Sequence, residues 1–215
     1  MLDGKTHFCR PKRPFANDFA VLARLVGKLP RKVGSLAHTD RWLSGYAPAA
    51  DAASIRVLCP VVEALAGGGK GLRSLGSESV TRNGHSAMLR VDYGQARLLL
   101  TSDLSTTSQR LLLACHGADE FNAGMARGCH HGSDDIDLPF VRAMAARATV
   151  ISSGDNEDYA HPRPRIQGAS ARYGRESLAP DGELLPPLLY STELARSVSL
   201  QFAAHARTMA EPKLP

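Results

Sequence analysis

The sequence predicts an α/β fold, and three patterns along the chain support this fold class. β-Branched or apolar runs at 55–60 and 148–152 are typical of strands. Two further strand-like runs, 86–93 and 96–101, are joined by a two-residue link that contains a glycine, which indicates a β-hairpin. A helix-like stretch at 105–117 follows the hairpin. Strands interspersed with helices in this way indicate an α/β domain.

Composition places the chain among globular proteins. With 215 residues, of which 43% are hydrophobic, it is long enough to bury one sizeable core. No apolar run approaches the ~20 residues of a membrane helix, and the first residues lack the pattern of a secretory signal. We therefore expect a cytoplasmic protein without a membrane partner. The four cysteines form no C-x-x-C pair, which argues against a structural zinc site and a disulfide framework.

The chain divides into three parts by composition. Residues 1–53 are basic and interrupted by prolines, residues 54–203 carry most of the strand and helix patterns, and residues 204–215 form a polar tail. The net charge is +5, and basic residues are frequent between Arg10 and Lys32. Such a segment is compatible with nucleic-acid binding or with an ordinary solvated face.

The first half of the central part predicts a strand, a loop and the hairpin. The strand at 55–60 is closed by its final proline. The glycine cluster at 67–71 predicts a flexible loop, because it lacks the G-K-[ST] ending of a phosphate loop. The first hairpin strand alternates apolar and polar residues, whereas the second is continuously apolar at 98–100. We therefore expect the second strand to be an inner strand.

The second half predicts helices between strands. Ser105 is suited to cap the helix that follows it, and the residues at 138–146 have a helical pattern. The run at 148–152 predicts a buried strand, and a last strand is expected at 188–193. The proline-rich stretch at 180–187 predicts a loop.

Potential metal ligands follow several of these strands. Asp103 comes just after the second hairpin strand, and His161 follows the strand at 148–152. His130 and His131 are adjacent, and neighbouring residues of an extended loop point to opposite sides, so we expect only one of them to face a metal. Imidazole and carboxylate groups suit Zn²⁺, or Mn²⁺ and Fe where carboxylates dominate. The pattern predicts a metal-dependent hydrolase site at these strand ends.

Five short motifs follow one another in the part of the chain from Ile55 to Ser197. They are Asn83-Gly84-His85-Ser86, Tyr93-Gly94, Leu99-Leu100-Thr101-Ser102-Asp103, His130-His131-Gly132-Ser133 and His161-Pro162. In this order the chain resembles the metallo-β-lactamase-fold hydrolases, in particular the branch of the soluble hydrolase domain of ComEC-type DNA-uptake proteins. The resemblance implies a four-layer αββα sandwich with a strand that begins near Asn83. It also implies two zinc ions, with Mn²⁺ or Fe as alternatives.

The resemblance assigns roles to individual residues. Asp103 corresponds to the carboxylate that bridges two metals, and His161 to a late histidine ligand. His130 and His131 correspond to a ligand, a proton donor or a substrate contact. The implied metal ligands are therefore Asp103, His131 and His161, and the implied catalytic residues are His130, His131 and Asp103. Ser102 replaces the usual glycine before the aspartate, a change that a negative φ would tolerate.

Three loop residues are candidates for substrate contacts. They are Ser133, Asp134 and Asn156. Hydrogen bonds within their own loops are an equally good explanation for these residue types. The family branch and the basic composition favour a phosphodiester, in a nucleic acid or a small molecule, as the substrate.

One element of the family is missing from the sequence. The family supplies half of its ligands from an H-x-H-x-D-H element, and the nearest string here is His38-Thr39-Asp40. We therefore expect 54–203 to be the C-terminal part of such a domain, incomplete at its N-terminus. A catalytic zinc site usually has three protein ligands, so the alternative is a truncated, non-catalytic half-domain that binds a partner.

A half-sandwich has a consequence for its surface. The sheet face that packs on the other half would be exposed, including parts of 98–100 and 150–151. Large exposed apolar patches seek partners, so we expect self-association or pairing with a missing N-terminal half.

Overall fold

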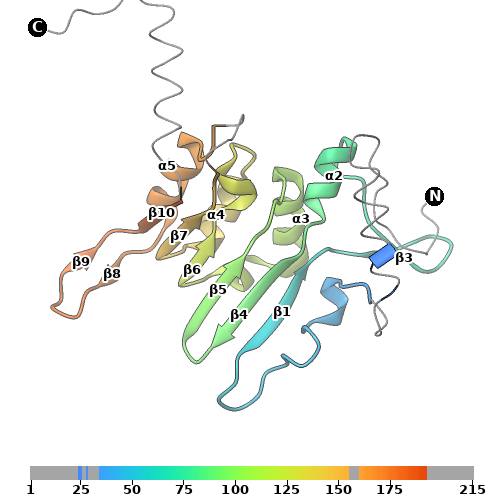
Figure 1. Ribbon diagram of the computed structural model, residues 1–215, viewed down its shortest axis with the longest axis horizontal. Helices are drawn as coiled ribbons and strands as arrows, with labels where there is room; N and C mark the ends of the chain where they lie inside the picture. Colours follow the sequence, from blue (N-terminus) through green and yellow to red (C-terminus); the bar gives the residue numbers. More distant parts are fainter. Residues whose placement is uncertain (1–23, 26–27, 29–33, 155–159, 193–215) are drawn as a thin grey trace, which may run out of the picture.

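The computed structural model describes residues 24–25, 28, 34–154 and 160–192, and its centre is a six-stranded mixed sheet with helices packed against it (Figure 1). The strand order is β1-β4-β5-β6-β7-β10, with β1, β4 and β5 antiparallel and β5, β6, β7 and β10 parallel. These strands are β1 (Ser54–Cys59), β4 (Met88–Tyr93), β5 (Ala96–Leu100), β6 (Met125–Arg127), β7 (Ala148–Ile151) and β10 (Leu188–Ser191). The mixed α/β class is confirmed.

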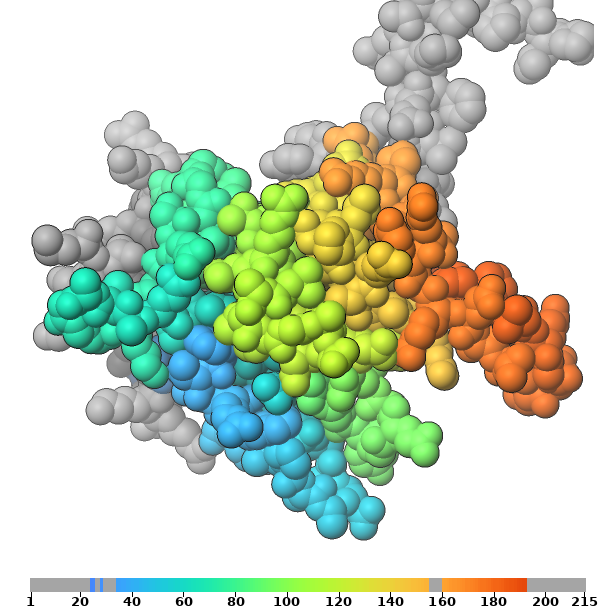
Figure 2. All heavy atoms as spheres, turned by 180° about the vertical axis from the view of Figure 1, so that it is seen from behind, coloured from blue at the N-terminus to red at the C-terminus, as the bar shows by residue number. Residues whose placement is uncertain are grey.

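Short helices and two small hairpins complete the described fold. The helices are α2 (Glu78–Gly84), α3 (Thr106–His116), α4 (Leu138–Met144) and α5 (Pro164–Tyr173), with 3-10 turns η1 (His38–Asp40), η2 (Ala118–Phe121) and η3 (Cys129–Gly132). The hairpins are β2 (Glu63–Ala64) with β3 (Lys70–Gly71), and β8 (Ser177–Leu178) with β9 (Leu184–Leu185). The β8–β9 hairpin projects beyond the edge of the sheet (Figures 1 and 2).

Most elements lie where the sequence predicts them. The strand at 55–60 is β1, the hairpin is β4 and β5, and the strands at 148–152 and 188–193 are β7 and β10. Ser105 is the N-cap of α3, because its hydroxyl accepts a hydrogen bond from the backbone N–H of Ser108. Asp137 caps α4 in the same way through Phe140.

One local expectation is wrong, and two loop expectations hold only in part. Asn83 lies at the end of α2, so the next strand begins at Met88 instead of at this residue. The glycine cluster at 67–71 contributes β3 to a small hairpin, and the proline-rich stretch at 180–187 contributes β9. Each hairpin is held by cross-strand backbone pairs that composition does not reveal.

One face of the sheet is covered by the helices. Leu99 of β5 and Ala126 of β6 are completely buried, and Thr149 continues this row on β7. Leu99 and Ala126 belong to the same hydrophobic core as Leu112 of α3 and Phe140 of α4. Paired residues on adjacent strands point to one face of a sheet, so this row marks the helix-covered face.

The opposite face of the sheet is apolar and partly exposed. We call it the open face and define it by Leu89, Val91, Leu98, Leu100, Met125, Arg127, Val150, Leu188 and Tyr190. Met125 is 43% exposed and Tyr190 is 54% exposed. Arg127 is the only charged residue in this set. Leu98, Leu100 and Val150 lie on the face predicted to be exposed, whereas Leu99 and Ile151 are buried.

An ionic network closes the helix-covered face near η2. Arg90 is 7% exposed and donates to Asp92 at 2.8 Å and to Glu120 at 2.6 Å. Arg97 donates to the second oxygen of Asp92, and Arg56 pairs with Glu120 at 3.2 Å. The two ion pairs of the buried Arg90 guanidinium offset the free-energy cost of removing it from water.

Replacing Arg90 with methionine is expected to lower the free energy of unfolding by about 3 kcal/mol, because it removes the buried member of this network. Arg82→Met is the matched control, because the Arg82 ion pair with Glu78 is exposed. We expect less than about 0.5 kcal/mol for the control. Urea denaturation followed by circular dichroism measures both, and equal effects would contradict the assignment.

Candidate functional site

The carboxyl ends of three neighbouring strands form the candidate site. Strands β5, β6 and β7 are adjacent and parallel, so the loops that follow them leave the same edge of the sheet. Asp103 lies in the loop after β5, His130 and His131 lie in η3 after β6, and His161 lies in the loop after β7. The topology therefore gathers at one edge residues that are up to 58 positions apart in the sequence.

Asp103, Arg127 and His131 form one group at this edge. The His131 Nε2 atom is 3.5 Å from Asp103 Oδ1, and Arg127 Nη1 is 3.6 Å from the same oxygen. Arg127 also contacts the Ser152 hydroxyl through Nε at 3.4 Å and Nη2 at 3.3 Å. All three charged or titratable side chains are partly exposed, so this group is open to solvent.

A hydrogen bond at Nδ1, on the side of the ring away from Asp103, orients His131. Its Nδ1 atom lies 2.7 Å from the backbone oxygen of Ser152. Because a carbonyl only accepts, Nδ1 carries the proton, and the 3.4 Å approach of Arg127 Nη2 to this atom is a contact between two donors. In the neutral ring the Nε2 lone pair therefore faces the Asp103 carboxylate. Two acceptors that face each other in this way are a suitable place for a cation between them.

His130 and His161 form a second pair. Their ring centroids are 6.1 Å apart, and the rings meet edge to face. His130 Nδ1 is buried without a hydrogen-bond partner among the described residues. His161 is 8% exposed. The two adjacent histidines thus have different neighbours, since His131 faces Asp103 and His130 faces His161.

The reason for this divergence differs from the expected one. His130 and His131 are not in an extended loop, because both have left-handed backbone angles, with φ of 46° and 52°. Ser102 and Ala160, in the flanking loops, also have φ of 52°. Left-handed non-glycine residues cost about 1–2 kcal/mol each and cluster at functional sites. Four of them along one sheet edge mark this edge as a place where the fold holds strain.

Ser102 has a positive φ of 52°, so it does not have the negative φ that would let a serine replace glycine easily. Its hydroxyl donates a 2.6 Å hydrogen bond to the Ala87 oxygen. We expect Ser102→Ala to cost about 1 kcal/mol, since it loses this bond and keeps the strained backbone. Ser102→Gly should recover most of that loss, because glycine tolerates positive φ. Urea denaturation measures both, and a glycine variant less stable than the alanine variant would contradict this explanation.

The three candidate substrate contacts have different outcomes. Ser133 Oγ accepts a hydrogen bond from the Asp135 N–H at 3.1 Å, which is a bond within its own loop. The Asp134 backbone oxygen accepts a 3.2 Å hydrogen bond from Arg165. Asn156 lies outside the described residues. A substrate role for all three stays a prediction.

Cys129 precedes the two histidines but has a structural role. It is completely buried, and desolvation raises the pKa of its thiol to about 11. A thiol with this pKa is protonated at neutral pH and is a poor nucleophile or metal ligand.

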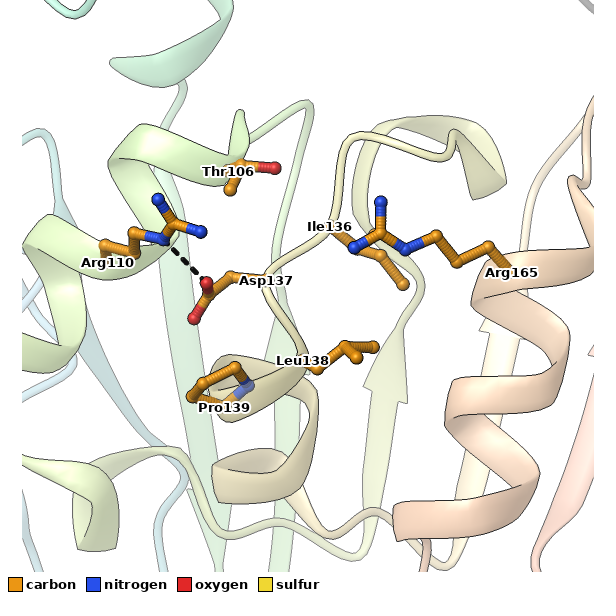
Figure 3. A pocket seen from close by; sticks show the side chains of 7 residues that line it. All are labelled: Thr106, Arg110, Ile136, Asp137, Leu138, Pro139 and Arg165. Atoms are coloured by element: carbon orange, nitrogen blue, oxygen red, sulfur yellow. Dashed lines mark hydrogen bonds and ion pairs between the residues drawn. The ribbon is translucent and has the colours of Figure 1, made fainter.

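A separate pocket lies on the helix-covered side, between the N-terminal ends of α3, α4 and α5 (Figure 3). Its volume is about 340 Å³, and Arg110 and Arg165 lie on opposite sides of it. Arg110 pairs with Asp137 at 2.8 Å, and Asp137 also caps α4. The buried Asp137 carboxylate of this pocket is thus occupied by an ion pair and a helix cap. None of the predicted site residues lines the pocket, so the strand-end edge is the better candidate site.

The residues at this edge fit a metal ion in part. Two ligands at the usual 2.0–2.2 Å from a tetrahedral zinc are about 3.4 Å apart, close to the 3.5 Å between His131 Nε2 and Asp103 Oδ1. The Nδ1 bond to Ser152 is the outer contact that metal-bound histidines usually make. However, the described residues contain no group of three His, Cys, Asp or Glu side chains placed to hold a metal. Asp103 and His131 form a two-ligand corner, and His161 does not complete it.

Arg127 is the residue that the sequence analysis missed. Its position three residues before His130 is visible in the sequence, but no motif connects it to Asp103. The connection depends on β6 lying beside β5, and the three-residue strand β6 was not predicted.

A comparison with known proteins finds a distant relative. Over 111 residues, or 51% of this chain, the sequence is 32% identical to the competence protein ComA of Neisseria gonorrhoeae. The matched stretch covers 16% of that protein, so this chain spans only a small part of its relative. No protein-family model matches the chain. The similarity is compatible with a ComEC-type relation. No helix in the described ranges is long and apolar enough to cross a bilayer.

Proposed function

We propose that the chain is part of a metal-dependent hydrolase domain of the metallo-β-lactamase type that cleaves phosphodiesters. The single observation that carries the proposal is the Asp103–His131 corner, whose geometry and outer hydrogen bond suit a zinc ligand pair. In the assembled site, bound metal would lower the pKa of a water and polarise the scissile phosphoryl group. The remaining ligands would come from outside the described residues.

The open face supports the same proposal. The two-ligand corner lies at the carboxyl edge of this face, beside Arg127. An apolar sheet face of this kind is suited to a second sheet, and a sheet packed there would complete the four-layer sandwich. Ligands carried by that second sheet would reach the corner from the side that the helices leave uncovered. The proposed half-domain therefore has an incomplete ligand set beside a sheet that is covered on one face only.

Metal binding to the full chain tests this function. We expect isothermal titration with Zn²⁺ to detect weak binding that Asp103→Asn and His131→Ala both abolish. Asp181→Asn, in the exposed turn between β8 and β9, is the matched control and should bind as the wild type does. We expect little hydrolysis of bis(p-nitrophenyl) phosphate at a two-ligand corner, because catalytic zinc usually has three protein ligands. Zinc binding that is indifferent to Asp103 and His131 would refute the proposal.

Nucleic-acid binding through the segment from Arg10 to Lys32 stays a prediction, because most of that segment lies outside the described residues. Of this segment, the structure describes only Arg24, Leu25 and Lys28.

A further inference from the structure

We propose that Arg127 is the resident cation of the Asp103–His131 corner, and that a divalent metal must displace its guanidinium from Asp103. This inference rests on the proposed function, because it concerns the loading of the same site. It adds a control element that the sequence motifs do not indicate.

The position of Arg127 is fixed from two sides. It is the last residue of β6, its β7 partner is Val150, and its side chain belongs to the open face. Two of its nitrogens lie within 3.4 Å of the Ser152 hydroxyl. This anchor holds the guanidinium at the carboxyl edge, where Nη1 reaches Asp103.

The contact with Asp103 is loose enough to be exchanged. The separation of 3.6 Å is longer than a charge-assisted hydrogen bond of about 2.8 Å. The side chains of Arg127 and Asp103 are 23% and 34% exposed, so water can replace either partner. Exposed ion pairs of this kind contribute little to stability. A stronger cation can therefore take the carboxylate without unfolding the edge.

The guanidinium opposes a metal at the corner. The same Asp103 oxygen faces both Arg127 Nη1 and His131 Nε2, so a metal between Asp103 and His131 would lie within a few ångströms of a positive charge. Removal of that charge should raise the affinity for a divalent cation by about tenfold, even after screening by solvent. Arg127 would thus keep the corner metal-poor until further ligands favour the metal over the guanidinium.

Titration of full-length variants with Zn²⁺ tests this inference. Arg127→Gln and Arg127→Met remove the charge and should bind Zn²⁺ about tenfold more tightly than the wild type. Arg127→Lys keeps a charge, and Arg142→Gln removes an exposed arginine from α4, so both should resemble the wild type. The double variant Arg127→Gln with Asp103→Asn should lose the gain. Thermal unfolding of each variant verifies that it is folded.

Two results would overturn the inference, and they separate it from the proposed function. If Zn²⁺ binds through Asp103 with equal affinity in the wild type and both uncharged variants, Arg127 is not the resident cation, although the two-ligand corner stands. If no variant binds Zn²⁺, both proposals fail. A gain that persists without Asp103 would also contradict the inference, because the metal would then bind elsewhere.

Discussion

Gly132→Ala is expected to lower the free energy of unfolding by about 2–5 kcal/mol. Gly132 ends the His-His-Gly turn with φ of 86°, a conformation that costs other residues about 1–2 kcal/mol. A Cβ atom there would lie 2.7 Å from Pro162 Cβ and 2.9 Å from Ile151 Cγ2. Neither neighbour can move freely, because Ile151 is completely buried and Pro162 is bound into the next loop. Overpacking of this kind costs a further 1–3 kcal/mol.

The matched control for Gly132 is Gly168→Ala in α5. Nothing lies within 4 Å of a Cβ atom at Gly168, and alanine favours helices over glycine by up to about 1 kcal/mol. The two substitutions should therefore change the urea midpoint in opposite directions. A Gly132→Ala variant as stable as the wild type would show that the turn and the Pro162 loop do not pack as described.

Self-association through the open face is the second large expected effect. We expect sedimentation velocity to show concentration-dependent association of the full chain. Leu100 and Met125 are both partly exposed on the neighbouring strands β5 and β6, and together they form an apolar surface. Leu100→Glu with Met125→Glu should weaken association by about 100-fold, since each buried apolar side chain contributes about 1.5 kcal/mol or more. The double substitution places two charges in the centre of the contact.

A second pair of exposed leucines provides the control for this experiment. Leu178 and Leu184 lie on the projecting β8–β9 hairpin and are 72% and 57% exposed. Their double substitution with glutamate should leave association unchanged, because the hairpin projects beyond the edge of the sheet (Figure 1). Association that depends on the hairpin, or a chain that is monomeric at every concentration, would contradict a role for the open face.

The long periodic elements of this fold could be predicted from local sequence. The β4–β5 hairpin and α3 have clear turn and capping signals at Gly94 and Ser105, and both are found where expected. Strand β6 was missed because its three residues, Met-Ala-Arg, are too few to show a period. Helix α2 was missed because its sequence is short and mostly polar, so it shows no apolar period. Its stabilisation by the Ser77 cap becomes visible only in the structure.

The candidate site could be predicted only in part, because its geometry depends on tertiary contacts. The motifs identified Asp103 and His131, which the fold brings within 3.5 Å of each other. They did not indicate that His130 would turn toward His161, since that depends on left-handed backbone angles in η3. They also did not indicate Arg127, whose role depends on strand order.

The most direct test of the central claim, that Asp103 and His131 form a metal-binding corner, is a Zn²⁺ titration monitored by the long-range ¹H–¹⁵N spectrum of the histidine rings. We expect the Nε2 resonance of His131 to shift, while His131 Nδ1 keeps its proton toward Ser152. Asp103→Asn should remove the shift. Zinc-dependent shifts confined to other histidines, or a His131 shift that survives Asp103→Asn, would contradict the claim.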